Sequence, residues 1–180
     1  MALQSGEEVR RCPLEIMVTG GWPNEQYPNK SQLYCTAGGK FYSLTDKGLR
    51  PVAHNFSPKM SAGKWKSSNG ISGSQYPAMR HFGTQTCHKL VAYAWLGPRP
   101  EGMEIDHLNG DIRNYSVTNL QYVTPAENRK RAKILRILRQ SGQDPRSFSR
   151  EELLNIFAKY EFRSPQETRE EFFIQLRIKN

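Results

Sequence analysis

The sequence predicts an α+β fold, and three patterns along the chain predict it. The stretch from Gln32 to Leu96 contains short runs typical of strands, separated by turns. Residues 103–140 follow the order strand, polar loop, strand and helix, which together would make a ββα unit. Two further patterns after residue 148 each begin with the residues of a helix capping box. We therefore expect a strand-rich N-terminal module, a ββα core and C-terminal helices.

The N-terminal half is expected to divide into two segments. Prolines interrupt residues 1–30, which we predict to be an irregular arm. Residues 31–86 are the strand-rich module, in which Ser, Gly and Lys at 55–74 favour a loop or weak strands. The strands are expected at Leu33–Thr36, Lys40–Leu44, Gln75–Met79 and Thr84–Tyr93, with a hairpin turn at Ala37-Gly38-Gly39.

The segment Cys87–Leu96 allows two interpretations. Its apolar content fits the end of a strand, whereas Leu90, Val91, Ala94 and Trp95 recur at helical spacing. A short helix in its later part is therefore a second prediction. Residue 87 is also where we expect the core, residues 87–141, to begin.

The ββα unit is the most clearly marked part of the chain. Its strands are expected at Met103–Leu108 and Leu120–Val123. Thr124 as N-cap, Pro125 at the first helical position and Glu127 as the capping-box partner predict a helix start. The helix should run to about Gln140, with Gly142 just past its end and with Ile134, Leu135 and Leu138 buried.

Residues 142–180 are predicted to be a C-terminal helical pair. Ser149 with Glu152, and Ser164 with Glu167, each match the start of a capped helix. A helix-turn-helix that contacts DNA is one interpretation of the pair. The near balance of acidic and basic residues over 151–180 argues against it, so a packing or dimerisation role is an equal alternative.

The charge of the chain indicates a polyanionic partner. Its formal net charge is +9, and no carboxylate occurs between Asp46 and Glu101. A second basic cluster begins at Arg129. A merely solvated surface is the alternative, but two separate clusters favour phosphate binding. The residues predicted to contact DNA are Lys59, Lys64, Lys66, Arg80, Lys89, Arg129, Lys130, Arg131 and Lys133.

Composition also argues against several classes of protein. The three cysteines, Cys12, Cys35 and Cys87, are odd in number and far apart, so neither a disulfide framework nor a C-x-x-C zinc site is expected. The sequence contains no apolar run of about 18 residues, so a membrane span is not expected. The N-terminus lacks the apolar region of a secretory signal. A reducing cytosol fits these features.

The sequence GMEIDHLNGD places Asp106 and His107 side by side at the end of a predicted strand. A salt-bridged turn would explain this pair, and so would a site in which one residue holds a metal while the other accepts a proton. If the ββα unit folds back on itself, Asn128 in the first helical turn faces the pair. Neighbouring side chains of a regular strand point to opposite faces, so we predict irregular backbone at 107–109.

Four segments within residues 88–131 closely resemble the HNH endonuclease family, in the branch of phage-encoded and intron-encoded homing endonucleases. They are HKLVA from His88, DHLNG from Asp106, NLQYVTP from Asn119, and Glu127-Asn128. The three letters of the family name correspond to His107, Asn119 and Asn128. More weakly, FYSLTDKGLRPV and the basic stretch after it resemble the DNA-contacting N-terminal module of these nucleases.

The resemblance implies a ββα-metal fold and a role for each site residue. His107 would be the general base, and Asp106 with Asn128 would hold one Mg²⁺ or Mn²⁺ ion. Asn119 would brace the loop and orient the histidine. His88, beside the apolar run LVAYAWL, is expected to be a structural, hydrogen-bonded histidine.

The implied function is a metal-dependent endonuclease that hydrolyses DNA, with a homing role as one option. A nucleic-acid-binding protein that keeps the fold without cutting is the alternative. The expected partner is DNA, and the expected location is the cytoplasm of a bacterium or of a phage-infected host. The sequence leaves monomer and homodimer undecided.

Overall fold

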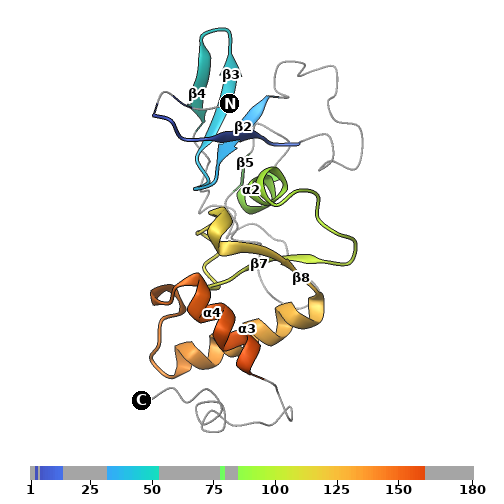
Figure 1. Cartoon of the computed structure of the whole chain (residues 1–180), viewed down its shortest axis with the longest axis vertical. Coiled ribbons are helices and arrows are strands. Elements are labelled where there is room, and N and C mark those ends of the chain that lie inside the picture. The colour runs from blue at the N-terminus through green and yellow to red at the C-terminus, as the bar shows by residue number, and fades with distance from the viewer. Residues whose placement is uncertain (1–2, 4, 14–31, 53–77, 80–84, 161–180) are drawn as a thin grey trace, which may run out of the picture.

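A computed structural model describes residues 3, 5–13, 32–52, 78–79 and 85–160 of the chain. Within these residues the fold is mixed α and β, with strands in the N-terminal part and helices in the C-terminal part (Figure 1). The elements in chain order are β1 (Val9–Arg11), β2 (Leu33–Thr36), β3 (Phe41–Thr45), β4 (Gly48–Val52), β5 (Ala78–Met79), β6 (Gln85–Thr86), α2 (Cys87–Trp95), β7 (Glu104–His107), η4 (Val117–Asn119), β8 (Leu120–Val123), α3 (Pro125–Gln140), η5 (Pro145–Ser147) and α4 (Arg150–Lys159).

The N-terminal sheet is antiparallel and has the strand order β1-β2-β3-β4. The predicted strands at 33–36 and near 40–44 are confirmed, as is the turn between them, where Gly39 has φ +85°. The prediction of an irregular arm is wrong at Val9–Arg11, because this segment pairs with β2 as β1. Three residues are too few to show a two-residue alternation, so backbone pairing rather than side-chain pattern defines this strand.

Helix α2 corrects the expected strand at Thr84–Tyr93. In the described part of this segment only Gln85–Thr86 is a strand, and the helix begins at Cys87. Leu90 and Val91 are fully buried, and they pack with Leu33 and Cys35 of the sheet in one hydrophobic core. Helical spacing therefore applies from Cys87 to Trp95, because one face of α2 packs against the N-terminal sheet. The predicted strand Gln75–Met79 lies within the described residues only at β5.

Three cysteines that are distant in the sequence meet in this first core. Cys12, Cys35 and Cys87 are all fully buried, and all three are free thiols. Burial raises the pKa of Cys87 to about 12, so its thiol stays protonated at neutral pH. The three cysteines therefore serve as small apolar residues of the core.

The ββα unit follows the sequence prediction closely. Strands β7 and β8 pair antiparallel, with His107 opposite Leu120, and α3 follows at once. The Thr124 side chain caps α3 by accepting a hydrogen bond from the Glu127 backbone N at 3.2 Å. The Glu127 carboxylate does not complete the capping box as predicted. It accepts a hydrogen bond from Arg131 Nε at 2.9 Å.

A second hydrophobic core joins α3 to α4. The predicted buried residues Ile134, Leu135 and Leu138 pack there against Leu153 and Phe157 of α4. The capping box of Ser149 and Glu152 is present at the start of α4. Helix α4 therefore has a packing role. The second predicted helix, from Ser164, lies outside the described residues.

The β7–β8 pair lies between α2 on one side and α3 with α4 on the other (Figure 1). Leu120 belongs to the first core and Leu108, directly after β7, to the second. The cores thus extend across the segment boundaries predicted at 86/87 and 141/142. Among the helices that the structure describes, none has the length and apolar character needed to cross a membrane.

Candidate active site

The end of β7 and the start of α3 enclose a small hollow of about 220 Å³. Asp106 and His107 line it, both with less than a tenth of their surface exposed, and so does Asn128 from the first turn of α3. The fold-back predicted for the ββα unit therefore places these three residues around one space. The residues that complete the lining are Ile105, Gly110, Ile112, Ala132, Leu135 and Arg139.

The backbone turns directly after His107. His107 itself is still paired in β7, so the predicted irregularity begins one residue later, at Leu108. The Gly110 backbone N donates to the His107 carbonyl O at 2.7 Å, and Gly110 has φ +67°. This conformation suits glycine because it has no Cβ. The turn ends the strand directly after Asp106 and His107, which both line the hollow.

The Asp106 carboxylate has two side-chain donors on one oxygen. Gln121 Nε2 and Arg131 Nη1 each lie 3.2 Å from Asp106 Oδ2. Burial raises the pKa of this carboxyl above its ordinary value, and the Arg131 guanidinium opposes that rise. Both side-chain donors therefore hold the same oxygen, Oδ2.

His107 lies edge-on to a second histidine. Its ring centroid is 5.1 Å from that of His88 on α2, with an angle of 71° between the planes. Burial lowers the pKa of His107 to about 4, although Asp111 opposes the shift, so the imidazole is neutral at neutral pH. Burial also lowers the pKa of His88, to about 3, with His107 and Lys89 adding to the effect. The structural role predicted for His88 stays a prediction, and its ring contact adds support for the placement of His107.

Asn119 holds the turn that follows β7. Its carbonyl O accepts from Leu108 N at 2.9 Å, and its Oδ1 accepts from Asn109 N at 3.1 Å. Its Nδ2 donates to the Asn114 carbonyl O at 2.7 Å. Asn119 thus braces the loop through backbone groups.

Asn128 has a partner that the sequence reasoning missed. Its Nδ2 donates to Glu104 Oε2 at 2.6 Å, an arrangement that directs its Oδ1 away from Glu104. Glu104 precedes Asp106 by two positions, so the alternation of side chains along β7 could have placed the two on one face. The other missed partner is Gln121, which lies opposite Asp106 on β8.

The oxygens around the hollow suit a hard divalent cation. A carboxylate from Asp106 and an amide oxygen from Asn128 are ligands of the kind that Mg²⁺ accepts, and Mg²⁺ often takes only one or two protein ligands beside water and phosphate. Among the described residues no group of three His, Cys, Asp or Glu side chains forms a metal cluster. The donor set therefore fits a metal that shares its coordination with substrate.

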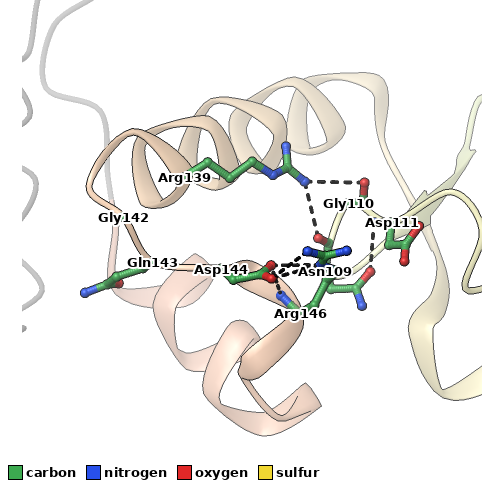
Figure 2. A pocket seen from close by; sticks show the side chains of 8 residues that line it. All are labelled: Asn109, Gly110, Asp111, Arg139, Gly142, Gln143, Asp144 and Arg146. Carbon is green, nitrogen blue, oxygen red and sulfur yellow. Dashed lines mark hydrogen bonds and ion pairs between the residues drawn. The ribbon is translucent and has the colours of Figure 1, made fainter.

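A second, larger hollow of about 380 Å³ adjoins the first. Gly110 and Arg139 line both. Figure 2 shows Arg139 extending from α3 toward the backbone of Asn109 and Gly110, where its Nη2 lies 3.4 Å from each carbonyl O. Arg139 belongs to the basic stretch of α3, but no local pattern separates it from its neighbours.

The predicted DNA contacts have different positions in the structure. Lys89 and Arg129 are exposed, and Lys130 and Lys133 are half-buried. Arg131 differs from the prediction, since its side chain is only 11% exposed and forms ion pairs with Asp106 and Glu127. A helix of 3.6 residues per turn directs one residue of a basic run inward. Lys59, Lys64, Lys66 and Arg80 lie outside the described residues.

The ββα unit thus carries an Asp-His pair at the end of β7, a buried Asn that braces the following turn, and an Asn in the first turn of α3. Residues 86–130 match the family model described as HNH endonuclease. The resemblance predicted from the sequence is thereby confirmed for this segment.

Two known proteins resemble the chain over longer stretches. It is 40% identical over 78 residues to YosQ of Bacillus subtilis (strain 168), an SPbeta prophage protein named as an HNH homing endonuclease. The matched region is 42% of this chain and 44% of that relative, less than half of its length. The second is a solved structure, described as DNA binding and cleavage by the HNH homing endonuclease I-HmuI. This chain aligns with it with a TM-score of 0.36 and 21% identity, and the alignment covers 62% of each chain.

Proposed function

We propose that the protein is a divalent-metal-dependent DNA endonuclease of the HNH type. The observation that carries the proposal is the hollow at the end of β7, which Asp106, His107 and Asn128 line together. This hollow lies within the segment that matches the HNH endonuclease family. A proton acceptor and two oxygen ligands at one site are what metal-assisted hydrolysis of a phosphodiester needs.

In the proposed reaction, the neutral imidazole of His107 accepts a proton from water. The water oxygen then forms a bond to phosphorus as the bond from phosphorus to the 3′ oxygen breaks. The departing 3′ oxygen takes up a proton from solvent water, which leaves a 5′-phosphate and a 3′-hydroxyl, and His107 releases its proton to solvent. Asn119 keeps the turn after His107 in place while the proton moves. A divalent ion on Asp106 and Asn128 would supply positive charge for the phosphate and for the departing oxygen.

The basic residues would hold the DNA backbone near this hollow. Arg139 lines the hollow itself, and the exposed Arg129 begins the basic stretch of the same helix. The net charge of +9 favours a polyanion such as DNA. We further propose a cytoplasmic location and a homing role, on the strength of the prophage relative YosQ. A single site would nick one strand, and two copies would be needed to cut both.

Cleavage of supercoiled plasmid DNA tests the proposal. The wild-type chain should convert plasmid to nicked or linear product with Mg²⁺ or Mn²⁺, and EDTA should stop the reaction. His107→Ala should lose cleavage by orders of magnitude, since general-base catalysis contributes about 10²–10⁴-fold, and should still shift DNA in a gel.

Two results would count against this function. Plasmid cleavage by His107→Ala at the wild-type rate would exclude His107 as the base. Gel shifts by the wild-type chain without any metal-dependent change in plasmid topology would instead favour a binding protein that keeps the fold without cutting.

A further inference from the structure

Arg131 pairs with the candidate metal ligand Asp106, although it lies in a basic stretch expected to face DNA. Its guanidinium pairs with Asp106 Oδ2 at 3.2 Å and with Glu127 Oε1 at 2.9 Å. Its Cζ lies 4.9 Å from the ring centroid of Phe157 on α4. The side chains of Arg131 and Asp106 are only 11% and 8% exposed. A side chain held on three sides in this way is poorly placed to reach a phosphate in solvent.

The burial of Asp106 explains why a cation is needed there. A carboxylate removed from water is strongly destabilised unless a positive group compensates it. In the proposed function a divalent ion would provide that charge, but only after it binds. Of the described side chains, only the Arg131 guanidinium forms an ion pair with Asp106, so it compensates the carboxylate before any metal arrives.

We propose that Arg131 is a positioning residue of the metal site, a built-in counter-ion that holds the Asp106 carboxylate in place for a divalent cation. Arg131 and Gln121 both donate to Oδ2 of this carboxylate. Phe157 covers the guanidinium, which makes α4 a structural support of this site. The inference rests on the proposed function, because it assumes that Asp106 is a metal ligand.

Two other roles for Arg131 predict different behaviour. A DNA contact would make its removal weaken DNA binding without changing how metal affects stability. A purely structural role under Phe157 would make its removal lower stability equally with and without metal. A counter-ion role predicts that a divalent ion replaces the missing charge, so metal should restore stability to a variant without Arg131.

Thermal unfolding in EDTA and in Mn²⁺ separates these roles. Arg131→Met should lower Tm in EDTA, and Mn²⁺ should raise the Tm of this variant by several degrees more than that of the wild type. Adding Asp106→Asn to Arg131→Met should raise the Tm in EDTA above that of the single variant, because the uncompensated charge is gone. The double variant should also lose the response to Mn²⁺.

Arg136→Met is the matched control, because Arg136 is exposed on the same helix and lies outside the lining of both hollows. It should respond to Mn²⁺ as the wild type does. Should Arg131→Met fail to fold, Arg131→Lys keeps a positive charge without the planar fork that reaches two carboxylates. Titration with Mn²⁺, followed by electron paramagnetic resonance, should then show an affinity changed at least several-fold from the wild type, with Arg136→Lys unchanged.

The outcomes distinguish this inference from the proposed function. If Asp106→Asn abolishes the Mn²⁺ shift while Arg131→Met keeps the wild-type shift, the counter-ion role is overturned and the metal site stands. An unchanged Mn²⁺ affinity in Arg131→Lys would overturn it in the same way. If Mn²⁺ stabilises neither the wild type nor Arg131→Met, the metal assignment of Asp106 fails, and the inference fails with it.

Discussion

Asn119 shows at the scale of one residue how an amide can hold the turn that follows a strand. Its oxygen accepts from the backbone of Asn109, and its nitrogen donates to the backbone of Asn114. The two bonds need a donor and an acceptor on the same side chain, which asparagine provides and aspartate does not. Asn119 is also buried, so each lost bond leaves a polar group without water.

We expect Asn119→Asp to lower the free energy of unfolding by about 1–3 kcal/mol and to reduce plasmid cleavage. The new carboxylate keeps the bond to Asn109 N but faces the Asn114 carbonyl O without a proton to donate. Urea unfolding and the plasmid assay measure the two effects. Asn114→Asp is the control, because the Asn114 side chain acts as an acceptor, from Ser116 N. Equal losses in the two variants would contradict the role of the Asn119 nitrogen.

At the scale of elements, the β2–β3 hairpin contacts the loop that leads to Asn119. A Cβ on Gly39 would lie 2.6 Å from two atoms of the Tyr115 ring, and Val117 N donates to the Ala37 carbonyl O at 2.8 Å. The Tyr115 ring is tilted against Phe41 of β3, with centroids 6.3 Å apart. The N-terminal sheet therefore supports the loop beside the candidate site through the turn of one hairpin.

The substitutions Gly39→Ala and Gly48→Ala separate this contact from backbone strain. Both glycines have positive φ, +85° and +98°, so alanine should cost each about 1–2 kcal/mol. Space around Gly48 is open, whereas the Tyr115 ring would have to move for Gly39, which should add about 1–3 kcal/mol. Chemical denaturation measures both. Similar values for the two variants would show that the hairpin does not press on Tyr115.

At the scale of the whole molecule, the site lies where two hydrophobic cores meet the same strand pair. The first core contains α2 and the N-terminal sheet, and the second contains α3 and α4. His88 from α2 contacts His107, while Phe157 from α4 covers Arg131 beside Asp106. The two members of the Asp-His pair are thus supported from opposite cores.

We expect Phe157→Ala to lower the free energy of unfolding by about 3–5 kcal/mol, because the side chain is 2% exposed in the second core. It should also weaken Mn²⁺-dependent cleavage, since the cover over Arg131 is lost. Phe148→Ala is the matched control, as Phe148 is only partly buried against the same core. Denaturation and plasmid assays at a temperature where both variants are folded test this. Full cleavage by Phe157→Ala under that condition would disprove the coupling.

Local patterns predicted much of the ββα unit. The limits of β8 and α3, the Thr124 cap and the meeting of Asp106, His107 and Asn128 agree with expectation, because caps, turns and apolar spacing depend on neighbours within a few positions. The strand β1 and the full length of α2 were not predicted. Their conformations depend on the sheet they pair with or cover, which a short window of sequence does not contain.

The sequence by itself determined the Asp-His pair, its two asparagine partners and the order of elements that brings them together. Only the tertiary structure decided that Arg131 turns inward to Asp106, that Glu104 holds Asn128 and that Arg139 lines the hollow. Each of these contacts joins residues about 24 to 30 positions apart across packed elements. A basic residue has the same local pattern whether it faces solvent or a buried carboxylate, so the packing of α3 against β7 and α4 makes the distinction.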